Sequence, residues 1–295
     1  MTASVALVGL ALLDHVFAVE RLPAAPGKHF ATGHRAVVGG IAANAALAVA
    51  RLGGRARLFG RVGDDAAGRE VRAALAAGGV DCAGLATARG ATPLSAVFVD
   101  ATGERMLVNR KDPALFAAPP VIDIAGCGAV MADLRWPAAT AAALSLARAA
   151  GAPAVLDYDQ APEAEARALL AGASHVVFGA EALAALTGLS DPAAGLAACA
   201  APAFAAVTLG AGGVLWRGPD GAGGHVPAFA VPVVDTLGAG DAFHGACALA
   251  LAEGADFPAA LRFASAVAAL KIGRPSGPDS LPTRPETLAL LGEPA

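Results

Sequence analysis

The sequence predicts an α/β fold in which helices cover both faces of a mostly parallel sheet. Short apolar runs alternate with alanine-rich helical stretches along most of the chain, the pattern of successive strand–helix units. The length of 295 residues suffices for one large domain, and at this size roughly three quarters of the unfolded surface can be buried. Two stretches without a helical pattern, 14–37 and 91–110, interrupt the alternation.

The individual elements follow from this alternation. Strands are expected at residues 5–10, 57–60, 129–132, 154–157, 175–178 and 206–209. Helices are expected at residues 41–52, 66–78, 138–150, 163–171 and 181–187, and another helix is expected to end near Leu251. The two interrupting stretches read as extended, because prolines and glycines punctuate them.

Composition excludes several classes of protein. The net charge of -4 and the pI near 5.8 provide no general attraction for nucleic acid or for acidic membranes. The hydrophobic content of 56% is high, but much of it is alanine, and apolar segments are broken by charged residues, glycine or proline before they reach the length of a membrane span. We therefore expect a soluble protein with no nucleic-acid or membrane partner.

The N-terminus and the cysteines indicate the compartment. No basic residue precedes the apolar stretch at 3–13, and Asp14 and His15 end it, so a first strand is a better interpretation than a signal peptide. The cysteines lie far apart and form no C-x-x-C motif, which indicates neither a zinc site nor a disulfide framework. A reducing cytoplasm fits this usage.

Residues 235–245 read DTLGAGDAFHG, and the chemistry of the chain is expected here. Glycines let the backbone turn sharply and approach a ligand, and the start of the following helix offers unpaired N–H groups and a partial positive charge. A phosphate can bind there while Asp241, in the first turn, stays ionised. Phosphoryl transfer to a hydroxyl needs an anion site and a base in one place. Taken alone, the segment also fits an ordinary helix start packed through its glycines.

Further motifs lie upstream. Residues 39–46 read GGIAANAA and run into ARLG at 50–53, and GRVGDD follows at 60–65. Together with the DTLGAGD segment, these motifs resemble the two signatures of the ribokinase-like (PfkB) carbohydrate kinases, in the right order and over nearly the whole chain.

The resemblance implies a domain organisation. It implies a ribokinase-like three-layer α/β sandwich with a mostly parallel central sheet and a small β-sheet lid over the sugar. Residues 1–13, 38–90 and 111–295 would form the α/β domain that binds nucleotide and substrate. Residues 14–37 and 91–110 would form the lid, which in this family often provides a dimer contact, so we expect a homodimer formed through the lid.

The nucleotide site is not a P-loop, because G-x-x-x-x-G-K-[ST] is absent. Residues 208–213 read TLGAGG, but the residues that follow look like a strand, whereas a dinucleotide-binding Rossmann motif needs a helix there. In the resembled family the matching Thr-x-Gly-x-x-Gly lies beside ATP, so Thr208, Gly210 and Gly213 are the nucleotide-binding candidates. A hairpin turn is an alternative interpretation that is compatible with this one.

ATP and Mg²⁺ are the expected cofactors, since ATP transfer requires neutralisation of charge on the β- and γ-oxygens. One family element departs from its pattern: Asn-x-x-Glu is replaced by FGAE at 178–181, so the asparagine is missing and Glu181 would have to act from a shifted register. Asp235 and Thr236, with the backbone of 271–277, match positions where many relatives hold a monovalent cation. K⁺ is therefore a further candidate.

Four residues match positions that approach the sugar in the resembled family. Asp14 follows the first strand, where relatives bind sugar hydroxyls with a carboxylate. Gly39 and Gly40 permit close approach of the backbone to a ligand. Asn44 follows them, although an asparagine at a helix start is often only a cap.

Cationic residues indicate which sugar is bound. The segment 131–135 ends in Arg135, where ribose kinases carry an acidic residue that faces the far end of the sugar. With Gly27 and Lys28 in the first lid segment and Asn109 in the second, this combination resembles the sulfofructose kinases, which phosphorylate 6-deoxy-6-sulfofructose at O1. The resemblance implies that Lys28, Asn109 and Arg135 bind the sulfonate, whose three acceptor oxygens suit such donors.

The resulting hypothesis is an ATP-dependent sugar kinase. Asp241 takes the proton from the primary hydroxyl of sulfofructose, while the turn at Gly238 lets the amides of Ala239, Gly240 and Asp241 hold the charge of the γ-phosphoryl group. The alternatives are a fructokinase, a fructose-6-phosphate kinase or another ketose or nucleoside kinase. A sugar-sensing or scaffold protein that retains the kinase fold is the alternative from another class.

Overall fold

The computed structural model describes residues 2–159, 163–199, 204–275 and 280–293. Its larger sheet has nine strands. Neighbouring strands pair in parallel, except for the two antiparallel pairs that the last three strands of the chain form with one another. In spatial order the strands are β13 (Gly223–Val226), β12 (Val214–Arg217), β11 (Phe204–Thr208), β10 (His175–Gly179), β9 (Ala154–Tyr158), β8 (Ala129–Ala132), β1 (Ser4–Val8), β4 (Arg55–Gly63) and β5 (Leu85–Ala88).

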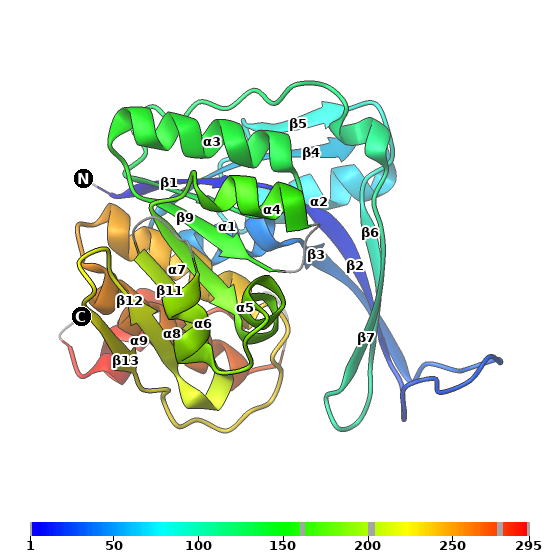
Figure 1. Cartoon of the computed structure of the whole chain (residues 1–295). Helices are drawn as coiled ribbons and strands as arrows, with labels where there is room; N and C mark the ends of the chain where they lie inside the picture. Colours follow the sequence, from blue (N-terminus) through cyan, green and yellow to red (C-terminus); the bar gives the residue numbers. More distant parts are fainter. Residues whose placement is uncertain (1, 160–162, 200–203, 276–279, 294–295) are drawn as a thin grey trace.

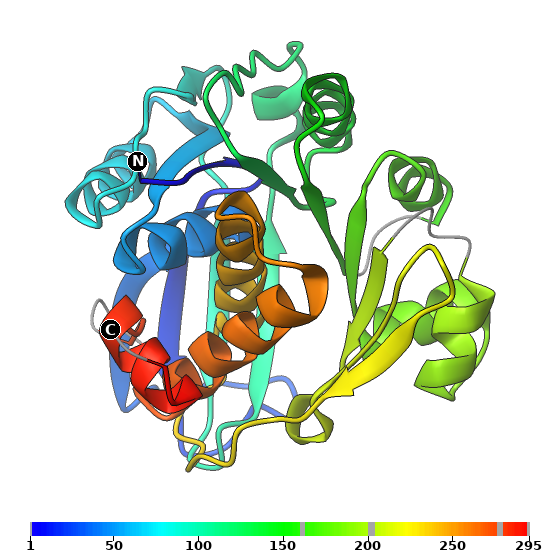
Figure 2. The same cartoon turned by 90° about the vertical axis from the view of Figure 1, so that its left-hand side faces the viewer.

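Two hydrophobic layers cover the faces of this sheet. Along β1, Val5 and Leu7 belong to one layer and Ala6 and Val8 to the other, since successive side chains of a strand point to opposite faces. One face carries α1 (Ile41–Arg51), α2 (Ala66–Ala77), α7 (Ala239–Ala252) and α8 (Phe257–Ile272). The other carries α3 (Pro137–Ala150), α4 (Glu163–Leu170), α5 (Ala180–Thr187) and α6 (Pro192–Ala198). In Figure 2 the orange α7 and α8 and the green α3 to α6 lie on opposite sides of the sheet. The predicted α/β fold class is confirmed.

A second, four-stranded sheet projects from this body (Figure 1). Its order is β3 (Gly33–Gly39), β2 (Leu12–Ala18), β6 (Leu94–Val99) and β7 (Arg105–Arg110). The β2–β6 pair is parallel, whereas β2–β3 and β6–β7 are antiparallel. We call these four strands the lid. They come from the two interrupting stretches, and β2 and β3 reach two residues further into the body because Leu12 pairs with Gly39.

The periodicity did not reveal α6, α8, α9 (Arg284–Leu291), β5 and β13. Local start signals could have revealed the two C-terminal helices. The Asp256 carboxylate accepts a hydrogen bond from the Ala259 N–H at 2.8 Å and so caps α8, and Thr283 forms a capping box with Glu286 at the start of α9. Helix α8 is buried on most of its surface, which obscures the amphipathic pattern that a sequence reading depends on.

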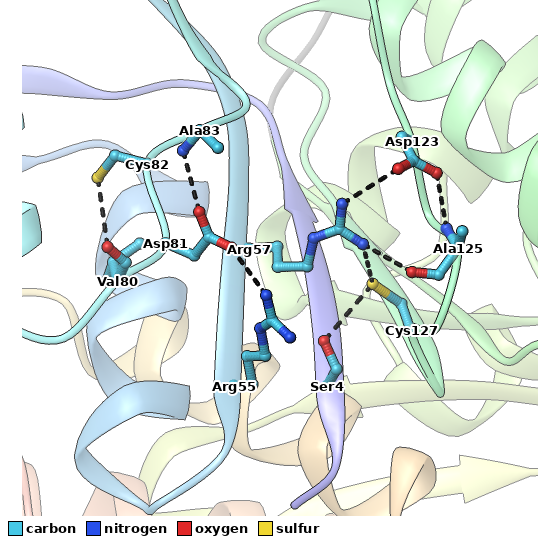
Figure 3. Close-up of polar contacts among 10 residues, drawn as sticks. All are labelled: Ser4, Arg55, Arg57, Val80, Asp81, Cys82, Ala83, Asp123, Ala125 and Cys127. Atoms are coloured by element: carbon cyan, nitrogen blue, oxygen red, sulfur yellow. Dashed lines mark hydrogen bonds and ion pairs between the residues drawn. The ribbon is translucent and has the colours of Figure 1, made fainter.

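The cysteines are free thiols and lie away from the lid. Figure 3 shows Cys127 near the starts of β1 and β4, where Arg57 donates to its sulfur at 3.5 Å and the Ser4 hydroxyl lies 3.7 Å away. The same guanidinium lies 3.3 Å from Asp123, so it ties β4 to the loop that precedes β8. Within the described ranges no helix is long and apolar enough to cross a membrane.

Candidate active site

The candidate site lies at the edge of the large sheet where its parallel strands end. Helices α1 and α7 begin at this edge, and the Asn44 side-chain amide donates to the Asp241 carboxylate at 2.7 Å. The two helices approach closely because position 245 is glycine, where a Cβ would lie 2.5 Å from the Ala45 carbonyl oxygen. The predicted helix start with Asp241 therefore meets Asn44 of the upstream glycine-rich motif, 197 positions away along the chain.

The turn before α7 leaves backbone donors for an anion. Gly238 has a φ of 73°, in the left-handed region that favours glycine, and the Ala239 N–H donates to the Thr236 carbonyl at 3.2 Å. Among the described residues the N–H groups of Gly240 and Asp241 have no backbone partner, and the space beside Gly240 is open to 4 Å. Of the three predicted amides, those of Gly240 and Asp241 thus lack a backbone partner in the described part of the chain, whereas that of Ala239 closes the turn.

Asp241 has the acid–base properties of a catalytic base. Burial raises its pKa to about 7, and the carboxyl groups of Asp157 and Asp133 act in the same direction. The hydrogen bond from Asn44 and the neighbouring His244 oppose the rise. A base whose pKa lies near neutral pH is partly ionised at that pH and can accept a proton from a hydroxyl.

Two buried residues beside Asp241 were not predicted. His244 Nδ1 lies 2.7 Å from the Gly240 carbonyl oxygen and 3.2 Å from Asp157 Oδ2 at the end of β9. Burial lowers the pKa of His244 and raises that of Asp157 well above its usual value, so both shifts favour the uncharged forms. The Gly240 carbonyl belongs to the same peptide group as the Asp241 N–H, so this contact helps to orient that donor. The sequence feature that could have revealed His244 is its spacing of one helical turn from Gly240.

Asp133, which was also not predicted, links three segments of the backbone beneath the site. Its buried carboxylate accepts hydrogen bonds from the N–H groups of Leu10 at 2.8 Å, Ala42 at 3.3 Å and Arg135 at 2.8 Å. These donors come from the end of β1, the start of α1 and the end of β8. Position 9 must be glycine, because a Cβ there would lie 2.1 Å from the Asp133 carboxylate.

The predicted sugar-binding residues meet at the base of the lid. The Asp14 carboxylate lies directly over Gly39, where a Cβ would be 2.1 Å from Asp14 Oδ2, and Gly40 has a φ of 97°. Asp14 pairs in register with Ser95 on β6, and Ser95 with Asn109 on β7. The Ser95 hydroxyl donates to Asn109 Oδ1 at 2.7 Å. The structure therefore forms a polar row across three lid strands, with Ser95 as a member that sequence reasoning missed.

The nucleotide candidates form a hairpin turn at the same edge of the sheet. Thr208 ends β11 and its hydroxyl donates to the Phe178 carbonyl at 3.3 Å. Gly210 and Gly213, with φ of 55° and 80°, frame the turn to β12, and a Cβ at Gly213 would lie 2.2 Å from the Val226 carbonyl oxygen. The turn is thus a tight backbone loop with an exposed glycine, a shape that admits close approach of a nucleotide.

The predicted sulfonate ligands are not all brought together. Gly27 and Lys28 lie in the loop between β2 and β3, at the end of the lid that is far from the body (Figure 1). In the part of the chain that is described, Lys28 makes no polar contact with Asn109 or Arg135. Arg135 instead forms an ion pair with Asp159, 2.6 Å between Nη2 and Oδ2.

Another cation lies beside Arg135. The Lys111 ammonium, one residue after β7, donates to the Arg135 carbonyl oxygen and lies 4.6 Å from the centre of the Phe116 ring. Burial lowers the pKa of Lys111. Its position two residues after Asn109, just past the end of β7, was the sequence feature that could have revealed it.

The expected cofactors can be compared with these residues. The free amides of Gly240 and Asp241 and the open space beside Gly240 fit a phosphate of ATP. Across the described ranges no group of three His, Cys, Asp or Glu side chains could hold a metal ion. Asp235 and Thr236 precede the turn, and the expected backbone partners at 271–277 lie partly outside the described residues.

Comparison with known proteins places the chain in a family. Residues 2–284 match the pfkB family of carbohydrate kinases. The chain is 32% identical over 283 residues to a fructokinase from Vibrio alginolyticus, covering 86% of this chain and 92% of the relative. A crystal structure from Agrobacterium tumefaciens, provisionally described as a ribokinase, superposes with a TM-score of 0.94 at 38% identity and covers 99% of this chain and 98% of that one. Arabidopsis thaliana ribokinase, complexed with ribose and ATP, gives a TM-score of 0.87 at 25% identity, with 99% of each chain covered.

The chain therefore belongs to the pfkB family of carbohydrate kinases. It has the ribokinase-like fold, and it is an ATP-dependent phosphotransferase with a sugar hydroxyl as acceptor. The predicted family and the predicted enzyme class are confirmed.

Proposed function

We propose that Asp241 removes a proton from a primary hydroxyl of a small ketose, which then receives the γ-phosphoryl group of ATP. The observation that carries this assignment is the placement of one recessed carboxylate, aligned by Asn44 at 2.7 Å, beside the unpartnered amides of Gly240 and Asp241. A base and an anion site at one helix start are the parts that phosphoryl transfer to a hydroxyl requires.

Each group has a separate task in this mechanism. The amides of Gly240 and Asp241 hold the charge that develops on the transferred phosphoryl group, and Asp241 holds the proton that leaves the hydroxyl. Mg²⁺ would supply neutralisation of the β- and γ-phosphate oxygens when it is bound. Thr208, Gly210 and Gly213 hold the nucleotide, and Asp14, Gly39 and Gly40 hold the sugar hydroxyls under the lid.

The finer proposal is that the ketose is 6-deoxy-6-sulfofructose, phosphorylated at C1. Its support is the pair of cationic side chains, Arg135 and Lys111, next to the end of the polar row at Asn109. A sulfonate is a permanent anion that accepts hydrogen bonds from such donors. The competing observation is the Arg135–Asp159 ion pair. Because Asp159 already balances the charge of this guanidinium, the arrangement is equally compatible with a neutral sugar such as fructose.

A comparison of acceptors tests the proposal. The purified protein is given ATP and either sulfofructose, fructose, fructose 6-phosphate or ribose, and ADP release is measured. We expect sulfofructose to have the highest kcat/KM. A clear preference for fructose or fructose 6-phosphate contradicts the sulfonate assignment and leaves the kinase assignment intact, whereas sugar binding without ADP release would favour a sensor protein.

Arg135 provides the charge test. Arg135→Ala leaves the sulfonate without a charge-assisted partner, which costs on the order of 1.5–3 kcal/mol, or roughly ten- to more than a hundredfold in kcat/KM. Asp159→Asn is the matched control, because it keeps Arg135 and frees it from its ion pair. The loss in the Arg135 variant should be confined to sulfofructose. An equal loss of kcat/KM on fructose would show that Arg135 maintains the structure of the site and does not recognise the sulfonate.

We also propose a homodimer formed through the lid, in the cytoplasm. One face of the lid carries the polar row, and the other carries a cluster of rings: His15 and His34 stack at 5.4 Å, and Phe17 lies 4.8 Å from His34 and 5.6 Å from Phe98. Such a partly exposed aromatic face suits a second copy. Light scattering should report a dimer for the wild type and a monomer for Phe17→Glu. A monomeric wild-type chain overturns this assignment.

A further inference from the structure

Asp235 precedes the anion-binding turn, and every polar group of this residue has a partner within the protein. Its N–H donates to the Ile272 carbonyl at 3.1 Å, and its Oδ1 accepts from the Leu237 N–H at 2.8 Å. Its Oδ2 lies 3.7 Å from the Arg35 guanidinium of lid strand β3. Its carbonyl oxygen accepts from the Lys271 ammonium at 3.1 Å.

Lys271 is a buried cation in the last turn of α8. The residue is only 3% exposed, and an ammonium is buried at a high free-energy cost unless acceptors and negative charge surround it. The negative end of the α8 dipole, the Asp235 carbonyl and the carboxylates of Asp235 and Asp241 provide this surrounding. Burial lowers the pKa of Lys271, the two carboxylates favour its charged form, and Arg105 and Arg35 oppose it.

This arrangement bears on the monovalent cation expected at Asp235 and Thr236. A K⁺ ion is held by several oxygen atoms, chiefly backbone carbonyls, that replace its water shell. Here the Asp235 carbonyl already accepts from the Lys271 ammonium, and the Asp235 carboxylate already faces the Arg35 guanidinium. Two cationic side chains of the protein therefore already lie against the residue that would have to bind the ion, so these donors do not fit an additional K⁺.

We propose that the Lys271 ammonium takes the place of a bound monovalent cation, so that this kinase works without K⁺. The ammonium holds the Asp235 carbonyl, and the Asx turn from Asp235 to Leu237 carries that restraint toward Gly238 and the phosphate-binding amides. Lys271 is thus a positioning residue for the anion site. The inference requires only a kinase of this family and is independent of which sugar is the substrate.

The wild-type enzyme gives the first test and needs no variant. Its sugar-dependent ADP release and its thermal unfolding midpoint are compared in 100 mM KCl, NaCl and choline chloride at equal ionic strength. We expect both quantities to be the same in the three salts, within about twofold for kcat and about 1 °C for the midpoint, since an ion that binds only the folded state would raise the midpoint. Activation or stabilisation specific to K⁺ overturns the proposal, and the thermal readout does so even if no substrate has been identified.

Substitution of the lysine gives the second test. Lys271→Met keeps most of the apolar stem and removes the charge, and Lys271→Arg keeps a charge and is the matched control. We expect Lys271→Met to lose tenfold or more of kcat/KM in choline chloride and to recover part of it in KCl or NH₄Cl, whereas Lys271→Arg should respond to none of these salts. An unimpaired Lys271→Met variant, or a loss that K⁺ and NH₄⁺ both fail to relieve in a folded protein, contradicts the proposal. If the variant does not fold, the wild-type experiment alone decides.

Discussion

The Asn44 amide donates to the Asp241 carboxylate at 2.7 Å and thereby joins two residues that are 197 positions apart in the chain. Asn44 lies in the first turn of α1 and Asp241 in the first turn of α7. The bond fixes one carboxylate oxygen on the α1 side and leaves the other for a proton. It also opposes the rise in the pKa of Asp241 that burial causes. This contact thus orients the proposed catalytic base and partly offsets the rise in its pKa that burial causes.

Asp241→Asn should abolish most turnover and leave ligand binding intact. The change preserves the shape of the side chain and its contact with Asn44, while the loss of a general base typically reduces rate by ~10²- to 10⁴-fold. Steady-state kinetics give kcat, and calorimetry gives the affinities for ATP and sugar. A variant with near-wild-type kcat would falsify the assignment of Asp241 as the base.

The pH dependence of the wild type should report the same group. Because the pKa of Asp241 is raised to about 7, the base is protonated below that pH, and kcat/KM should fall about tenfold for each pH unit well below 7. The profile should level off above pH 8. The residual activity of Asp241→Asn should lack this acid limb, and a wild-type limb near pH 4 would contradict the raised pKa.

Asp241 should also destabilise the folded protein at the pH where it is active. Its folded-state pKa of about 7 lies above the ordinary value of 3.8, so the contribution of this group to the free energy of unfolding is fully present below pH 4 and is lost as the pH rises through 7. Asp241→Asn removes the buried charge and should be more stable than the wild type at pH 8, by at most about 4 kcal/mol. Urea unfolding at pH 5 and pH 8 measures this difference, which should be larger at pH 8. Equal differences at both pH values would rule out the charge as the cause.

Asn44→Leu should weaken catalysis through the base rather than through the sugar. Without the amide, the ionised form of Asp241 loses a hydrogen bond, so we expect kcat to fall by roughly tenfold, the order of one lost hydrogen bond to a charged group. The acid limb of the pH profile should move to higher pH. Asn44→Asp, which adds a second carboxyl group, should move it further in the same direction. A change in KM alone would assign Asn44 to sugar binding instead.

The lid should become protected when both substrates are bound. Amide exchange in β2, β3, β6 and β7 should slow in the presence of sugar and a non-hydrolysable ATP analogue, because closure places these strands over the ligands. Helix α3 provides the internal control, since it packs in the other hydrophobic layer of the large sheet from α1 and α7. Uniform protection of α3 and the lid would show that these strands do not act as a lid.

Much of the fold could be predicted because local patterns determine it. Alternation of apolar runs with helical stretches gave the parallel sheet, since buried parallel strands are apolar on both faces, as β1 is. Helix α8 escaped prediction because it is buried on most of its surface and therefore lacks a polar stripe. The capping residue Asp256 can still be recognised in the sequence, so a helix start can be identified even where the hydrophobic periodicity is absent.

The sequence by itself determined the family, the class of reaction and the segment that carries Asp241, because glycine spacing and the residue types of a phosphate-binding helix start are local features. Only the tertiary structure decided which distant residues modify that segment. It brought Asn44 and Asp157 near the base, paired Arg135 with Asp159 and placed the Lys271 ammonium on the Asp235 carbonyl. The physical reason is that charges and hydrogen bonds act over a few ångströms of space, and residues far apart in the chain reach such distances only once the sheet and helices have assembled.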